Sequence, residues 1–179
     1  GVHPLTWLDP SIGALLDKHL EPEWTERLVD FDGWEKIYSV PDKELWDVRW
    51  TLKERMLRAI QHKMALQSQR FASSAKKGKT PEIALNPDAL TIGFARRFAT
   101  YKRATLIFRD LERLKKILNH RDRPVQLIFA GKAHPADRPG QSFIARVHEI
   151  SQMKEFAGKV VMVEGYDMHL ARHLVSGVD

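Results

Sequence analysis

The sequence contains no cysteine and no long apolar run, and each absence narrows the class of protein. The lack of cysteine among 179 residues excludes disulfide bonds and cysteine-bearing zinc or iron–sulfur sites. It is also typical of a reducing, cytoplasmic location. No apolar stretch approaches the ~20 residues that a transmembrane helix needs, so no membrane partner is expected. Residues 1–4 lack the charged start of a secretory signal, and no initiator methionine is present, so we expect an internal piece of a longer protein.

The composition predicts a folded domain with a basic surface. Apolar residues make up 43% of the sequence and charged residues 29%, which is enough for a core beneath a polar surface. The formal net charge of +6 favours anionic partners. Nucleic acids, phosphate esters and acidic surfaces all satisfy this requirement, so charge alone does not choose among them.

Residues 1–80 have a helical pattern and contain every tryptophan of the chain. Ser11 is predicted to cap a helix over 12–20, and Pro22 is predicted to lie in the first turn of the next helix. The longest helical pattern begins at Pro41 or Asp42 and fades into a polar stretch, residues 73–78, that predicts a loop. Its apolar residues recur at steps of three and four, at Leu45, Val48, Leu52, Met56, Ile60 and Met64.

Residues 81–179 alternate between short apolar runs and amphipathic helices. Strands are predicted over 89–94, 125–130 and 160–163, with a fourth opening at Val178. Helices are predicted over 102–118, 142–153 and 168–175, the last two preceded by the capping candidates Asp137 and Asp167. The strands recur about every 35 residues, the length of a βαβ unit. We therefore expect a helical segment, 1–80, followed by a Rossmann-like parallel sheet, 81–179, with its ligand site beyond the carboxyl ends of the strands.

The loop after the first predicted strand is strongly basic. Residues 96–103 contain Arg96, Arg97, Lys102 and Arg103 and no acid. A helix that begins after a strand offers free N–H groups and a dipole that favour an anion. Cations at the same place are unfavourable unless a bound anion offsets them, which predicts a phosphate-type ligand. The alternative is a solvated basic face.

The next two strand ends also carry polar side chains. Gly131 permits a tight turn after the second strand, Lys132 adds a cation, and His134 is a candidate ligand contact. Tyr166 follows the third strand, where it could stack on or hydrogen-bond to a ring. An ordinary loop and a packed tyrosine are the alternatives. Because the three strand ends converge on one crevice, their combination is stronger evidence than any one of them.

Two other clusters predict no site. His169 and His173 share a helix face, but no third ligand or H-E-x-x-H pattern accompanies them, so we expect no metal. A group of cations lies near the end of the helix predicted over 102–118, where it suits the helix dipole better than it suits a nucleic-acid patch. These residues are Arg113, Lys115, Lys116, Arg121 and Arg123.

The strand-end segments carry a family resemblance. Residues 95–103 (Ala-Arg-Arg-Phe-Ala-Thr-Tyr-Lys-Arg) and 129–137 (Phe-Ala-Gly-Lys-Ala-His-Pro-Ala-Asp) resemble the paired signatures of α-glucan (glycogen and maltodextrin) phosphorylases. Residues 1–7 are similar to that family's Asn-Gly-Val-His-x-x-Thr-Trp segment, without its first residue. The resemblance implies part of the C-terminal domain of a GT-B fold. It also implies transfer of a glucosyl unit between an α-1,4-glucan and inorganic phosphate, giving glucose 1-phosphate, with pyridoxal phosphate as cofactor.

The resemblance also implies residue roles. Arg97 and Lys102 would contact the substrate phosphate, while Arg96 and Lys102 would lie at the cofactor phosphate. Tyr166 would pack by the cofactor, and Lys132 would act through the electrostatics of the cleft. His134 stays a candidate substrate contact because of its place in the second loop. The cofactor's phosphate performs the acid–base work in this family, so two phosphates lie close together. Cations between them are then needed to offset their repulsion.

The departures from the family pattern also carry expectations. Ala99 stands where animal-type members have histidine, which points to the bacterial and archaeal branch. The Schiff-base lysine and a glycine-rich sugar loop are expected after Asp179, so the chain alone is expected to be inactive. Its exposed sheet edge favours self-association. One alternative hypothesis is a nucleotide-sugar-dependent GT-B glucosyltransferase of the glycogen synthase type. Another is a basic nucleic-acid-binding domain, although no motif that reads a nucleic-acid groove supports it.

Overall fold

A computed structural model describes residues 3–74 and 84–179 of the chain, and it contains a three-stranded parallel sheet. The strands are β1 (Leu90–Ala95), β2 (Val125–Ala130) and β3 (Val160–Val163), in the order β1-β2-β3. The three strand predictions are confirmed, with β1 displaced by one residue. The expected division of the chain between residues 80 and 81 lies outside the described residues.

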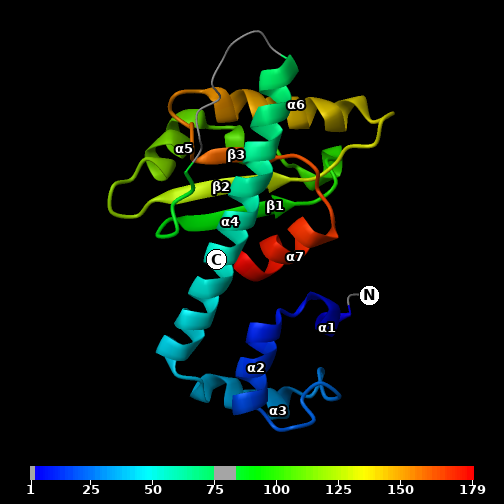
Figure 1. The fold of residues 1–179 in the computed structure, drawn as a ribbon, viewed down its shortest axis with the longest axis vertical. Helices are drawn as coiled ribbons and strands as arrows, with labels where there is room; N and C mark the ends of the chain where they lie inside the picture. Colours follow the sequence, from blue (N-terminus) through cyan, green and yellow to red (C-terminus); the bar gives the residue numbers. More distant parts are fainter. Residues whose placement is uncertain (1–2, 75–83) are drawn as a thin grey trace.

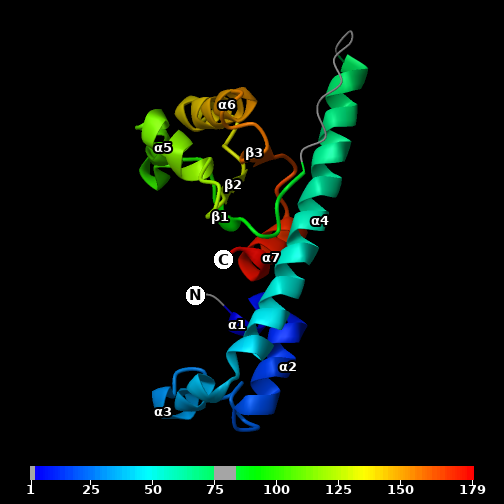
Figure 2. The ribbon, with the colours of Figure 1, turned by 90° about the vertical axis from the view of Figure 1, so that its left-hand side faces the viewer.

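Helices cover both faces of the sheet (Figures 1 and 2). Leu127 and Phe129 of β2 pack with α5 (Leu111–Leu118) and α6 (Arg138–Gln152) on one face. Ile128 and Ala130 face the opposite way, toward α4 (Asp42–Ser74) and α7 (Met168–Gly177). Alternate residues of a strand point to opposite faces, so a strand that is apolar throughout must be covered on both. This arrangement confirms the predicted Rossmann-like α/β fold.

Residues 3–40 form a small helical cluster below the sheet (Figure 1). Its helical elements are α1 (Pro4–Trp7), α2 (Pro10–His19), α3 (Phe31–Trp34) and the 3₁₀ helix η1 (Glu35–Ser39). Trp24 is buried there with Leu16 and Leu20. The 33-residue helix α4 runs from this cluster along the sheet (Figure 2). No described helix combines the length and the apolar character needed to span a membrane.

Two predictions in the helical cluster are wrong. Asp9, rather than Ser11, caps α2, because its carboxylate accepts the Ser11 N–H at 2.9 Å and Pro10 occupies the first helical turn. Pro22 begins no helix, and residues 22–26 form turns. The predicted start of α4 at Asp42 is confirmed. The helix continues to Ser74, and the rest of the loop predicted over 73–78 lies outside the described residues.

The helix predicted over 102–118 is also shorter than expected. The 3₁₀ helices η2 (Thr100–Lys102) and η3 (Leu106–Phe108) precede it, and α5 itself begins at Leu111. Arg103 adopts a left-handed conformation with φ 53°, which interrupts a continuous α-helix. Asp110 then caps α5 by accepting the Arg113 N–H at 2.9 Å. The predicted caps Asp137 and Asp167 are confirmed for α6 and α7.

After α7 the chain returns to the free edge of β1. The Asp179 N–H donates to the Thr91 carbonyl at 3.1 Å. On the other side of β1, the Leu90 N–H donates to the Pro124 carbonyl, next to β2. Val178 and Asp179 form no assigned strand, although a fourth strand was predicted there. The strand order therefore runs from β1 to β3, and the chain then reverses to the opposite side of β1. Such a reversal is where open α/β sheets bind ligands, at the carboxyl end of the strand.

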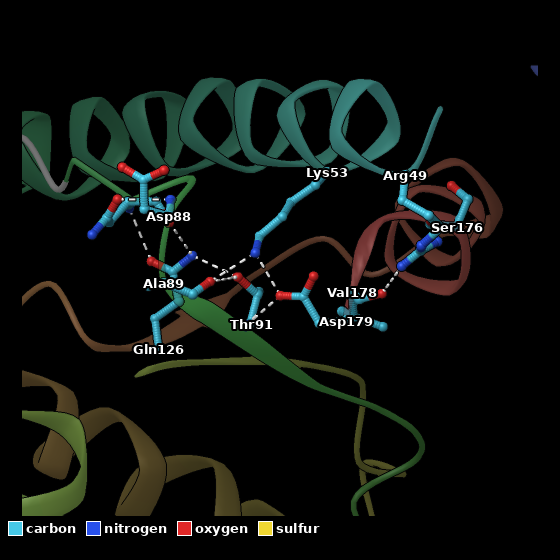
Figure 3. A network of polar contacts seen from close by, with 10 residues as sticks. Arg49, Lys53, Asp88, Ala89, Thr91, Gln126, Ser176, Val178 and Asp179 are labelled. Carbon is cyan, nitrogen blue, oxygen red and sulfur yellow. Dashed lines mark hydrogen bonds and ion pairs between the residues drawn. The ribbon is translucent and has the colours of Figure 1, made fainter. Parts of the chain in front are cut away.

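A buried polar network joins α4 to the free side of β1, near the first residues of that strand (Figure 3). Lys53 is only 6% exposed, and its ammonium contacts Asp179 Oδ2 at 2.5 Å and the Ala89 carbonyl at 2.8 Å. Asp179 Oδ2 also accepts the Thr91 N–H at 2.8 Å, and the Gln126 amide donates to Thr91 Oγ1 at 2.8 Å. Arg49 donates to the carbonyls of Ser176 and Val178. The end of α7 is thereby held against α4 and β1.

Candidate functional site

The loops after the three strands meet at the carboxyl edge of the sheet. The Phe98 N–H in the first loop donates to the Lys132 carbonyl in the second at 2.9 Å. The Tyr166 hydroxyl in the third loop donates to the Ala95 carbonyl, at the end of β1, at 3.3 Å. The structure thus brings together the three segments that sequence analysis singled out. A backbone hydrogen bond joins the first two loops, and the Tyr166 hydroxyl joins the third loop to the end of β1, while the roles of the individual side chains stay predictions.

Two glycines permit this close approach. A Cβ atom at Gly131 would lie 2.1 Å from the Arg96 carbonyl oxygen, and one at Gly140 would lie 2.2 Å from the Phe98 carbonyl oxygen. Both distances are far below van der Waals contact with backbone atoms that cannot move independently. The second loop and the start of α6 therefore pack directly on the basic segment. The sequence pattern drew attention to Gly131 but missed Gly140, because a glycine in the first turn of a helix carries no distinctive signal.

The cations of the basic segment lie at the surface of this edge. Arg96 and Arg97 are exposed, Lys132 is exposed, and Lys102 is half-buried. The Lys102 Nζ atom lies 4.6 Å from the centroid of the Tyr101 ring, a cation–π distance. Across residues 3–74 and 84–179, no carboxylate forms an ion pair with any of these four cations. The edge therefore concentrates positive charge that this part of the chain does not neutralise.

His134 is exposed but takes part in a local turn. Its Nδ1 atom accepts the Ala136 N–H at 3.1 Å, and the Gln141 side-chain amide donates to the Pro135 carbonyl at 2.7 Å. Asp137 then caps α6 by accepting the Gly140 N–H at 2.9 Å. His134 thus shapes the loop, and its other ring nitrogen faces no described hydrogen-bonding partner.

The loop that carries Tyr166 is held by helix α4, which sequence analysis did not anticipate. Lys63 donates to the Gly165 carbonyl at 3.1 Å and to Asp167 Oδ2 at 2.9 Å. Gly165 has φ 66°, a conformation that favours glycine. The pKa of the Asp167 carboxyl is lowered, first by the hydrogen bond from the Leu170 N–H and then by that from Lys63. No sequence signal indicates this contact, because about a hundred residues separate the two partners.

His169 and His173 line an open cavity of about 500 Å³ between α1 and α7. Trp7, Asp9 and Arg172 also line it. In the part of the chain that the structure describes, no three histidine, aspartate or glutamate side chains are placed to share a metal ion. The pKa of His173 is lowered, first by burial and then by Arg55 and His169, while Asp9 and Asp167 oppose this shift.

The lowered pKa of His173 predicts loss of stability in mild acid. The unfolded chain binds a proton on His173 more readily than the folded chain does. His173 therefore does not lower the free energy of unfolding above the unfolded pKa of about 6.5. The free energy of unfolding should fall as the pH drops through that value toward the folded pKa. Urea unfolding at pH 7.5 and pH 5.5 should show a smaller acid-induced loss for His173→Gln than for the unmodified chain. Exposed His62→Gln is the matched control, and an equal loss in all three proteins would contradict this prediction.

The fold and the edge together define a class of protein. After a parallel, Rossmann-like sheet in the order β1-β2-β3, the chain returns to the other side of β1, and unneutralised arginine and lysine side chains follow β1. Sheets of this kind bind phosphate-bearing ligands at the reversal point, outside the carboxyl ends of the strands. The chain is a Rossmann-like α/β unit.

Comparison with known proteins shows which proteins the chain resembles. No protein-family model matches the chain. The chain is 46% identical over 180 residues to maltodextrin phosphorylase of Thermococcus litoralis, in an alignment that covers 100% of the chain and 21% of the relative. It is 41% identical over 179 residues to glycogen phosphorylase of Aquifex aeolicus, covering 100% of the chain and 26% of the relative. It is also 36% identical over 181 residues to glycogen phosphorylase of Mycobacterium bovis, covering 100% of the chain and 20% of the relative.

The whole chain is therefore homologous to a part of the α-glucan (maltodextrin and glycogen) phosphorylases. It spans between about a fifth and a quarter of the length of these relatives. The family resemblance seen in the strand-end motifs is confirmed, and the similarity extends over the whole chain rather than over those motifs alone.

Proposed function

We propose that the protein containing this chain is an α-1,4-glucan phosphorylase. It transfers the terminal glucosyl unit of a glucan such as maltodextrin to inorganic phosphate and releases glucose 1-phosphate. In this reaction the glycosidic bond at C1 breaks, a C1–O bond to phosphate forms, and a proton passes to the oxygen of the shortened glucan. The observation that carries the proposal is the concentration of unneutralised cations at the carboxyl edge of the sheet, in a chain homologous to phosphorylases.

The basic segment supplies the phosphate-binding groups. Arg97 offers a planar pair of donors to the substrate phosphate, and Lys102 adds a compact charge beside it. Both side chains stabilise the negative charge that gathers on phosphate oxygens as the glycosidic bond breaks. Lys132, whose backbone is tied to the same segment, raises the positive potential of the edge. His134 borders the substrate from the second loop.

The same edge fits the phosphate group of pyridoxal phosphate. Arg96 and Lys102 would hold that phosphate, because no described carboxylate competes for either cation, and half-buried Tyr166 would pack beside the cofactor. When bound, the cofactor supplies a second phosphate that performs acid–base work on the first. The cations of the edge allow the two phosphates to lie side by side by offsetting their repulsion.

The surrounding architecture follows the same proposal. Residues 81–179 form the Rossmann-like part of a GT-B C-terminal domain, and the helical segment 1–80 links it to the facing domain. Exposed apolar side chains of β1, Leu90 at 49% and Ile92 at 45%, lie on the face that α5 and α6 only partly cover. This uncovered area suits packing against further parts of the protein or against a second copy.

Assay of the full-length protein tests the proposed function. It should contain pyridoxal phosphate, seen by absorbance and by release on denaturation, and it should form glucose 1-phosphate from maltodextrin and phosphate. Glucosyl transfer from ADP- or UDP-glucose without pyridoxal phosphate would replace the proposal with the nucleotide-sugar alternative. Steeply salt-dependent binding of nucleic acid without either activity would replace it with a nucleic-acid-binding function.

A further inference from the structure

The second half of α4 presents a row of three polar side chains to the loop after β3. Lys63, Gln67 and Arg70 are spaced by four and three residues, so they lie along one side of the helix. The loop, residues 164–167, carries Tyr166 and ends at Asp167, the cap of α7. This row follows the carboxyl end of β3 rather than the apolar face of the sheet.

The contacts of this row reach the backbone of the loop as well as its side chains. Gln67 Oε1 accepts the Glu164 N–H at 3.1 Å, and its Nε2 atom donates to the Met162 carbonyl at 3.3 Å. Lys63 donates to the Gly165 carbonyl at 3.1 Å and to Asp167 Oδ2 at 2.9 Å. An amide and an ammonium from one helix thus hold backbone groups of Met162, Glu164 and Gly165. Arg70 adds an ion pair with Glu164 at 3.3 Å.

These contacts matter because the loop has a special backbone conformation. Gly165 has a left-handed φ of 66°, and the residue itself is exposed. A short turn of this kind has few internal hydrogen bonds, so outside donors and acceptors determine where it lies. The position of Tyr166 follows from that of its neighbours, and its hydroxyl reaches the Ala95 carbonyl, immediately before Arg96.

We propose that Lys63 and Gln67 of α4 are positioning residues for the anion site at the carboxyl edge. They hold the Glu164–Gly165 turn so that Tyr166 rests on the end of β1 and supports the start of the basic segment. Neither side chain touches the bound phosphates. This inference rests on the proposed function, since it assigns α4 a part in the phosphate site of that same enzyme.

A purely structural role for Lys63 makes a different prediction. Asp167 caps α7 through Oδ1, which accepts the Leu170 N–H at 2.7 Å, whereas Lys63 contacts Oδ2. Lys63→Met therefore leaves the cap in place while releasing the Gly165 carbonyl. If Lys63 only stabilised α7, its loss would lower the melting temperature without changing how the enzyme uses phosphate.

The experiment uses the full-length protein and compares Lys63→Met and Gln67→Leu with the unmodified enzyme. We expect kcat/KM for phosphate to fall by about 10- to 100-fold, mainly through KM for phosphate, because a small displacement of a positioned site is costly. KM for maltodextrin should change less. Amide hydrogen exchange of residues 164–167 should become faster in both variants. Lys63→Arg keeps a donor to Gly165 and should recover most of the activity.

Lys43→Met is the matched control, because Lys43 lies on the same helix and pairs with Asp47 at the exposed surface, its own side chain 83% exposed. It should leave all of these quantities unchanged. Unaltered phosphate kinetics in Lys63→Met and Gln67→Leu, with phosphorolysis intact, would overturn the positioning role while leaving the proposed function in place. Absence of phosphorolysis in the unmodified enzyme would instead overturn the proposed function itself, and the hydrogen-exchange result would still report whether α4 fixes the loop.

Discussion

Arg97→Ala in the full-length protein is expected to lower kcat for phosphorolysis by about 100- to 1,000-fold, the usual cost of removing one donor that acts in the transition state. The free energy of unfolding should stay within about 0.5 kcal/mol, because Arg97 is exposed and forms no described ion pair. If Arg97 stabilises charge rather than packing, its loss lowers kcat without lowering the free energy of unfolding. Steady-state kinetics with maltodextrin and phosphate, together with urea unfolding, measures both.

The control for Arg97 is an arginine with the same charge and exposure but a different place in the fold. Arg121 lies in the exposed turn between α5 and β2, at the opposite end of the sheet from the basic segment. Arg121→Ala should retain the phosphorolysis rate of the unmodified enzyme. Equal losses in the two variants would point to net charge rather than to a specific contact. Full activity of Arg97→Ala would remove Arg97 from the phosphate site.

The second large effect concerns stability at the other end of the sheet. Asp179→Ala should destabilise the fold by about 3–5 kcal/mol, because it leaves the buried Lys53 ammonium without its carboxylate. The Lys53 side chain is 8% exposed and that of Asp179 is 27% exposed, so the lysine bears most of the desolvation cost. Removing both charges in Lys53→Met with Asp179→Ala should be less damaging than Asp179→Ala alone.

Urea unfolding of the two single variants and the double variant gives the coupling between the charges. Lys43→Met is again the control, since its exposed pair with Asp47 should contribute less than about 1 kcal/mol. A coupling energy near zero would show that Lys53 is satisfied by the Ala89 carbonyl and solvent. The ion pair would then have no special role in fastening α4 to β1.

The strands and the caps of α6 and α7 could be predicted from sequence because their signals are local. β3 is an uninterrupted apolar run, β2 is apolar except at Gln126, and Asp137 and Asp167 stand directly before the helices that they cap. The stretch from Lys102 to Asp110 was predicted wrongly for an equally local reason. Its apolar spacing is helical, but Arg103 adopts a left-handed conformation that a non-glycine sequence does not announce.

The sequence by itself determined the chemistry of the edge. It placed Arg96, Arg97 and Lys102 after one strand and Lys132 after the next. If the strands are parallel, their carboxyl ends lie at the same edge of the sheet, so these cations must meet there. Tertiary structure alone decided how that edge is built and held. The close contacts of Gly131 and Gly140, and the hold of Lys63 and Gln67 on the Tyr166 loop, join residues that are distant in the chain. Hydrogen bonds and steric contacts act over a few ångströms of space, so spacing along a sequence does not reveal them.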